Sequence, residues 1–147
     1  MARRKSVIAR SRGEVLTIWR PALARQKLVY ILVADKSQKY RYGRSRIVYI
    51  GTTEKGASRI ASSAAFRGEQ AFINLRGVKE IQAHVIGCRP RQGVEIWKKL
   101  EIAAILAFRQ EYGDIPKLNK IGKRRKIGDA FAYFNDDKLV TILKDFE

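Results

Sequence analysis

Five residues along the chain carry side chains that could act together in catalysis: Tyr30, Tyr49, Arg59, Glu101 and Asn119. An arginine can bind two anionic oxygens at once through parallel hydrogen bonds. Glu101 is a lone carboxylate in the middle of an apolar helical stripe, where burial without a partner is costly. We therefore expect Glu101 to hold a cation, to pair with an arginine at the edge of the core, or to do both.

Two apolar runs would position the tyrosines. Residues 28–34 are almost continuously apolar and β-branched, which predicts a buried strand, and residues 47–51 predict a second one. Antiparallel pairing of the two strands would bring Tyr30 and Tyr49 close together. The polar, basic residues 35–46 are predicted to form an extended hairpin connection, and Gly51 lets the backbone turn at the end of the second strand.

The composition of residues 54–66 is helical, with Thr53 or a neighbour as its cap, and it places Arg59 in the first turns, facing back toward the strands. A surface arginine is the simpler alternative in a chain as basic as this one. Residues 79–88 predict a third, half-buried strand, with Ala83 and Val85 inward and His84 on its polar side.

The longest predicted helix spans residues 91–112, has Glu101 in its apolar stripe, and ends at Gly113. We also expect an edge strand at residues 15–19 and a β-like run at residues 139–143. The fold class is therefore predicted as α/β: a small, mainly antiparallel sheet of three or slightly more strands flanked by helices, in the order β-β-α-β-α.

The order of these features resembles the GIY-YIG nuclease family. The first family motif corresponds to Leu28-Val29-Tyr30 and the second to Tyr49-Ile50-Gly51, followed by an arginine, a glutamate and an asparagine at Arg59, Glu101 and Asn119. The resemblance covers residues 27–120. The first motif lacks the glycine and the isoleucine of the family, and the long gap between the two tyrosines implies an inserted hairpin.

The resemblance implies metal-dependent hydrolysis of a phosphodiester in DNA. Glu101 would bind Mg²⁺, with Mn²⁺ as a possible substitute, and Arg59 would hold the phosphate. Tyr49 would act as general base or position the water if a cation and Arg59 lowered its pKa, which is ordinarily about 10. Tyr30 would orient Tyr49. Asn119 would form a hydrogen bond near the phosphate or fix the loop in which it lies.

The charge of the chain points to a polyanionic partner. Its 147 residues suffice for one domain, and they carry a net charge of +17, with 31 basic and 14 acidic residues. One cysteine and one histidine exclude a Cys/His zinc site and fit a cytoplasmic setting. No apolar run is long enough to cross a bilayer, and we expect no membrane partner.

Several basic segments are candidates for nucleic-acid contact. A basic arm at residues 1–12 could follow a phosphate backbone or be a solvated terminus. Tyr40 and Tyr42 lie among basic residues and could stack on bases or be ordinary strand residues. Residues 121–147 form a C-terminal extension, predicted to pack on the core or to form a dimer contact. The basic residues assigned to nucleic-acid binding are Arg44, Arg46, Lys55, Lys117, Lys120, Lys123, Arg124, Arg125 and Lys126.

The function predicted from the sequence is that of an Mg²⁺-dependent endonuclease acting on DNA, with double-stranded DNA as the expected substrate. A compact, single-domain restriction-type or phage-type enzyme is the preferred subtype, with a homodimer as one assembly. Two alternatives stay open: a nucleic-acid-binding protein of the same fold without catalysis, and an RNA- or ribosome-associated basic protein.

Overall fold

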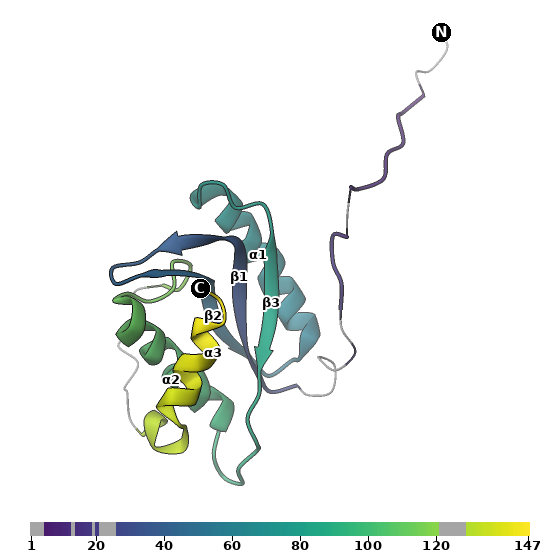
Figure 1. Cartoon of the computed structure of the whole chain (residues 1–147). Coiled ribbons are helices and arrows are strands. Elements are labelled where there is room, and N and C mark those ends of the chain that lie inside the picture. The colour runs from purple at the N-terminus through teal and green to yellow at the C-terminus, as the bar shows by residue number, and fades with distance from the viewer. Residues whose placement is uncertain (1–4, 13, 19, 21–25, 121–128) are drawn as a thin grey trace.

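The computed structural model describes residues 5–12, 14–18, 20, 26–120 and 129–147. A three-stranded antiparallel sheet lies at its centre, formed by β1 (Leu28–Lys39), β2 (Arg44–Thr53) and β3 (Ile81–Ile86) in the order β2-β1-β3. Helix α1 (Ala57–Asn74) covers one face of the sheet. The other face is covered by α2 (Ile96–Tyr112), a short 3-10 helix η2 (Ala130–Tyr133) and α3 (Asp136–Lys144) (Figure 1). The α/β class and the β-β-α-β-α order are confirmed.

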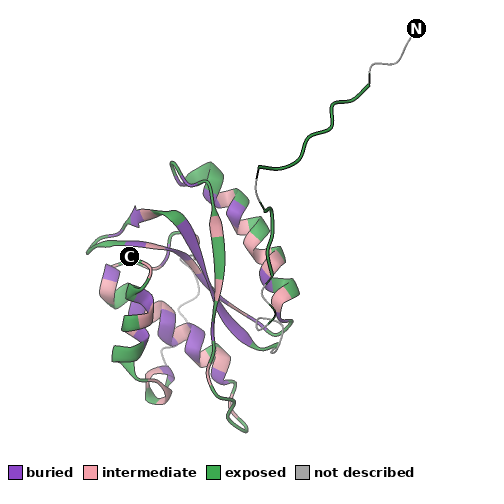
Figure 2. Ribbon diagram, turned by 45° about the vertical axis from the view of Figure 1, so that its right-hand side comes forward, coloured by how far each residue is buried: buried purple, intermediate pink, exposed green. Residues whose placement is uncertain are grey.

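Strand β1 is the central strand of the sheet, and both of its faces are buried over residues 28–34 (Figure 2). This explains why the sequence is apolar at every position of this run. Leu28, Tyr30 and Leu32 pack in the cluster under α1, whereas Val29 and Ile31 pack in the cluster under α2 and α3. The period of two in a strand separates these two sets.

The paired strands run further than predicted. β1 continues to Lys39 and β2 begins at Arg44, so most of the predicted hairpin connection is strand. The pairing skips one residue between Leu32–Tyr49 and Val33–Ile47, which leaves Val48 as an extra residue in a bulge. Bulges bend a strand and often lie beside functional sites.

Helix boundaries also differ from the prediction. α1 begins at Ala57, where Gly56 with φ 69° is the N-cap, while the Thr53 hydroxyl accepts a bond from the Lys55 N–H in the turn before it. α2 begins at Ile96, because residues 91–94 form a turn closed by a bridge between Arg91 and Val94. It ends as predicted at Gly113, which adopts φ 85°.

The β-like run at residues 139–143 was a wrong prediction, since these residues lie in α3. The Asn135 side chain caps this helix by accepting from the Lys138 N–H, and Leu139 and Leu143 are buried one turn apart. A short apolar run of this kind is compatible with the two-residue period of a strand and with the 3.6-residue period of a helix. The Asn135 cap shows that this one is a helix. Ala130, Leu139 and Leu143 join the core, so the described part of the C-terminal extension packs on the core as predicted.

The edge of the sheet at β3 is less covered than predicted. Ala83 and Val85 are exposed, and Ile86 alone in this strand is buried. His84 is half-buried, with its ring centroid 4.9 Å from that of Phe146. Residues 15–18 form no strand; the N-terminal segment leads away from the fold and its described residues are exposed (Figures 1 and 2).

Candidate active site

The two tyrosines of the motif-like strands lie together, as the sequence predicted. Tyr30 stands opposite Gly51 across the β1–β2 ladder, and Tyr49 lies two residues before Gly51 on the same face of β2. Their ring centroids are 5.9 Å apart and the rings are tilted by 44°. The diagonal neighbours of one antiparallel pair thus present two phenols on the face that α1 covers.

Gly51 is required beneath these rings. A Cβ atom at this position would lie 2.6 Å from a ring carbon of Tyr49, 2.9 Å from its hydroxyl oxygen and 3.0 Å from the Tyr30 ring. Real side chains essentially never approach so closely. The glycine of the Tyr-Ile-Gly sequence therefore permits the two phenols to pack over the strand.

Helix α1 supplies two further side chains to this cluster. The hydroxyls of Tyr30 and Ser63 are hydrogen-bonded at 2.7 Å, and the central guanidinium carbon of Arg67 lies 3.8 Å from the Tyr49 ring centroid. Ser63 and Arg67 are four residues apart and so lie on one face of the helix. Arg59 is four residues before Ser63, at the start of the same row.

The structure distinguishes the two arginines. Arg59 is exposed, and within the described residues no hydrogen bond, ion pair or ring contact involves it. Arg67 is half-buried, and its Nε is buried without a hydrogen-bond acceptor among the described residues. Sequence reasoning missed Arg67, although its eight-residue spacing from Arg59 is the helical signal that could have found it.

Tyr49 has a raised pKa. Burial raises it most, followed by the neighbouring Tyr30 phenol; the Arg67 guanidinium lowers it, and the Glu101 carboxylate raises it further. We expected a cation and Arg59 to lower this pKa. In the protein itself Arg67 provides the lowering effect, and burial outweighs it, so the phenol is protonated at neutral pH.

Glu101 is buried in α2, with 5% of its surface exposed, as its place in the apolar stripe predicted. Its carboxylate is the last of the groups that raise the pKa of Tyr49, after burial and the Tyr30 phenol. The described residues contain no group of three or more His, Cys, Asp or Glu side chains placed to hold a metal ion.

Asn119 fixes its loop to the edge of the sheet. Its side-chain oxygen accepts from the Ile50 N–H at 3.0 Å, and its amide donates to the Ile50 carbonyl at 2.9 Å. The Leu118 N–H donates to the carbonyl of Val48 in the bulge. Of the two roles predicted for Asn119, the structure shows the one that fixes the loop beside the tyrosine strand.

The predicted nucleic-acid-binding residues fall into several places. Lys55, Lys117 and Lys120 are exposed. Arg44 is exposed and donates to the hydroxyl and the carbonyl of Ser37. Arg46 is half-buried, and its backbone N–H donates to the Phe146 carbonyl. Burial of His84 lowers the pKa of that ring most, and the charge of Arg46 lowers it further. The basic cluster Lys123, Arg124, Arg125 and Lys126 lies outside the described residues.

The two hairpin tyrosines differ in exposure. Tyr40 is a core residue whose hydroxyl donates to the Ile47 carbonyl and accepts from the Lys117 N–H. Burial raises its pKa to about 12. Tyr40 therefore has no free ring face for a base, and Tyr42 is exposed.

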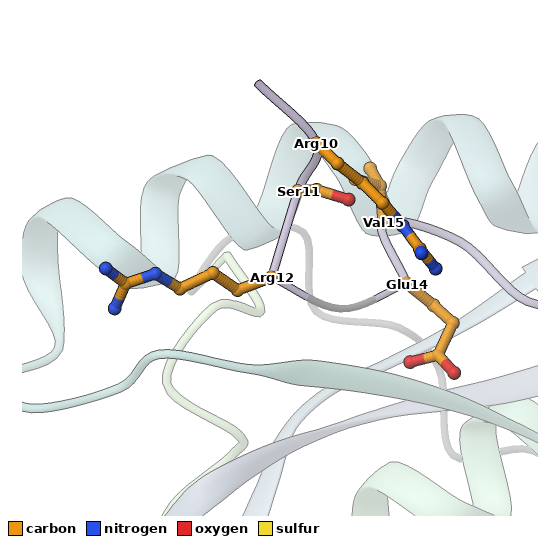
Figure 3. Close-up of a pocket in the computed structure, with 5 residues that line it drawn as sticks. All are labelled: Arg10, Ser11, Arg12, Glu14 and Val15. Carbon is orange, nitrogen blue, oxygen red and sulfur yellow. The ribbon is translucent and has the colours of Figure 1, made fainter.

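A concavity elsewhere is formed by the N-terminal segment. It is lined by Arg10, Ser11, Arg12, Glu14 and Val15, all from one exposed stretch of chain (Figure 3). None of these residues belongs to the tyrosine cluster. No helix or strand of the sheet fold lines it, and we assign it no chemistry.

The chain was compared with models of protein families, with curated proteins and with solved structures, and none of them matches it. No helix within the described residues has both the length and the apolar character needed to cross a membrane.

Proposed function

We propose that the protein is an endonuclease that hydrolyses phosphodiester bonds in DNA with the help of Mg²⁺. The observation that carries this proposal is the cluster around Gly51, in which two phenols and the Arg67 guanidinium meet. Glu101, buried in α2, contributes to the raised pKa of Tyr49. Phosphodiester hydrolysis needs a cationic clamp on the phosphate, a positioned water and a stabilised leaving oxygen. The residue types in the cluster match these needs.

The phosphate clamp is assigned to the arginine row of α1. Arg67 is fixed against Tyr49, and the outer nitrogens of its half-buried side chain would donate to phosphate oxygens. Arg59 at the exposed start of the row is placed to meet the nucleic acid from solvent. Arginine suits both tasks because its planar fork binds phosphate bidentately.

Hydrogen-bond donation and positioning of the water are assigned to the two phenols. Because the pKa of Tyr49 is raised, this phenol is a hydrogen-bond donor and water-positioning group at neutral pH. Tyr30, held by Ser63, fixes the orientation of the pair. Glu101 would hold the cation, which supplies charge neutralisation at the phosphate.

A nucleic-acid-binding protein without catalysis is the second candidate. The observation that favours it is the raised pKa of Tyr49, which leaves no strong base in the described part of the cluster unless the cation is bound. Both candidates predict strongly salt-dependent binding, because the chain carries +17 and each neutralised phosphate adds about −0.9 to the logarithmic salt slope.

Cleavage of supercoiled plasmid DNA separates the two candidates. We expect nicking or linearisation with Mg²⁺, with Mn²⁺ as a substitute, and none in excess chelator. Glu101→Gln should abolish cleavage while keeping the melting transition. Glu111→Gln is the matched control, since Glu111 lies on the same helix and forms an ion pair with Lys144 of α3.

Full cleavage by Glu101→Gln would remove the metal-ligand assignment. Salt-sensitive DNA binding by the wild type, with no cleavage under any of these metal conditions, would establish the binding protein in place of the enzyme.

A further inference from the structure

The tip of the β1–β2 hairpin presents an exposed aromatic side chain. Tyr42 is 66% exposed, whereas Tyr40, two residues earlier, is buried in the core. Residues 40–43 form the tight connection, closed by a bond from the Tyr40 N–H to the Gly43 carbonyl. Most of this tyrosine is open to solvent, so part of its ring surface is available for a ligand.

The tip is held rigidly by the end of α2. The Tyr42 N–H donates to the Tyr112 carbonyl at 3.0 Å. Gly113 approaches so closely that a Cβ on it would lie 2.7 Å from the Arg41 Cβ and 2.9 Å from the Tyr42 ring. The position of the exposed ring is therefore set before any ligand arrives, which lowers the entropy lost on binding.

A cation lies beside this ring. The guanidinium carbon of Arg41 lies 5.6 Å from the Tyr42 ring centroid. Further along the hairpin, Lys39 and Arg44 pair across the end of the ladder and are exposed, with the Arg44 guanidinium bonded to Ser37. A fixed aromatic ring with a cation beside it is the combination that binds a nucleobase and its phosphate.

We propose that Tyr42 and Arg41 form a stacking site for an unpaired nucleobase, so that the preferred substrate is DNA with a single-stranded or extrahelical base. This proposal takes DNA as the ligand from the proposed function, but it does not depend on cleavage. A base within a regular duplex is stacked on both sides and cannot present its face to Tyr42. An unpaired base can do so at little cost.

Strand β2 joins the two sites: Arg44 begins the strand directly after the hairpin tip, and Tyr49 lies five residues further along it.

Fluorescence of 2-aminopurine tests the site directly, since this base is quenched on stacking. The probes are a short DNA duplex with one unpaired 2-aminopurine and the same duplex fully paired, in chelator so that no cleavage occurs. We expect quenching and tighter binding for the unpaired probe. Tyr42→Ala should weaken that binding roughly 5- to 150-fold and abolish the quenching, whereas Tyr42→Phe keeps both.

Tyr133→Ala is the matched control, because Tyr133 also has cations over its ring, Arg91 and Lys99, but lies in η2. It should leave both probes unaffected. Equal losses on paired and unpaired probes in Tyr42→Ala, or unchanged quenching, would overturn the stacking site. Neither result bears on plasmid cleavage by the wild type, which tests the enzyme separately.

Discussion

Arg67 lies over the ring of Tyr49, with its guanidinium carbon 3.8 Å from the ring centroid. The contact joins the middle of α1 to the second strand and brings a permanent cation to the face of the phenol. The ring holds the planar guanidinium by cation–π attraction while its outer nitrogens remain available for hydrogen bonds. One arginine can therefore be positioned by a tyrosine and act on a phosphate.

Replacing Arg67 should impair cleavage more than replacing Arg59. Arg67→Lys keeps the charge but loses the planar fork that lies on Tyr49, and we expect a loss of about 10²-fold in single-turnover cleavage at saturating Mg²⁺. Arg59→Lys, at the exposed end of the same row, is the matched control with a smaller loss. Comparable losses in the two variants would contradict a central role for Arg67.

Tyr49→Phe and Arg67→Lys should not act independently. If the arginine is held by the ring and serves the same step as the phenol, the double variant should be little worse than the worse single one. The measurement is the same cleavage assay on all four proteins. Fully multiplicative losses would assign the two residues to separate steps.

Gly51→Ala should displace the tyrosine pair. The new methyl group would lie within 3.0 Å of both rings, so we expect destabilisation of about 1–3 kcal/mol and loss of cleavage with DNA binding retained. Gly68→Ala in α1 is the control, because a Cβ there makes only ordinary contacts, at 3.8 Å with Ile81 of β3 and at 3.9 Å with Phe72. Alanine should stabilise that helix by up to about 1 kcal/mol. Chemical denaturation measures both changes.

Elements were predicted correctly where the pattern of apolar residues and glycines favours one type of secondary structure over the other. The continuous apolar run at residues 28–34 is short and rich in β-branched residues, which favours a strand covered on both faces, and Gly113 is the left-handed stop of α2. The segment at residues 139–143 was assigned wrongly, because its spacing fits two periods until the Asn135 cap is seen. The alternation of apolar residues in β3 does not predict that Ala83 and Val85 are exposed, because it does not show that no helix covers this edge of the sheet.

The candidate site was predicted in part for a similar reason. Strand pairing follows from sequence order, so the meeting of Tyr30 and Tyr49 was predictable. The choice between Arg59 and Arg67 depends on which turn of α1 lies against Tyr49, which the sequence does not specify. Likewise, the contrast between Tyr40 and Tyr42 arises where the hairpin turns, because only one of the two rings can point into the core.

Asn119→Ala should uncouple the loop from β2. The variant loses two hydrogen bonds and leaves the N–H and carbonyl of Ile50 unpaired, which should cost about 1–3 kcal/mol of stability. Cleavage should fall even under conditions in which the protein is fully folded, because Ile50 is next to Tyr49. Asn135→Ala is the control: it loses the α3 cap at a cost of about 1 kcal/mol and should leave cleavage unchanged.

The fold should lose stability as the pH rises above about 10. Burial raises the pKa of Tyr40 to about 12, and burial followed by its bond to the Glu147 carboxylate raises the pKa of Tyr112 as well. Between the unfolded value near 10 and the folded values, the folded chain binds more protons than the unfolded chain, so the free energy of unfolding falls with pH. For Tyr40 the loss is about 2 kcal/mol at pH 12.

Urea denaturation at a series of pH values from neutral to alkaline measures this slope. Tyr40→Phe should be less stable than the wild type at neutral pH, because the Ile47 carbonyl and the Lys117 N–H lose their partner, yet its stability should fall less above pH 10. Tyr112→Phe should flatten the slope in the same way. Stability that is constant across this range in the wild type would mean that these phenols are not shielded from solvent as the structure describes.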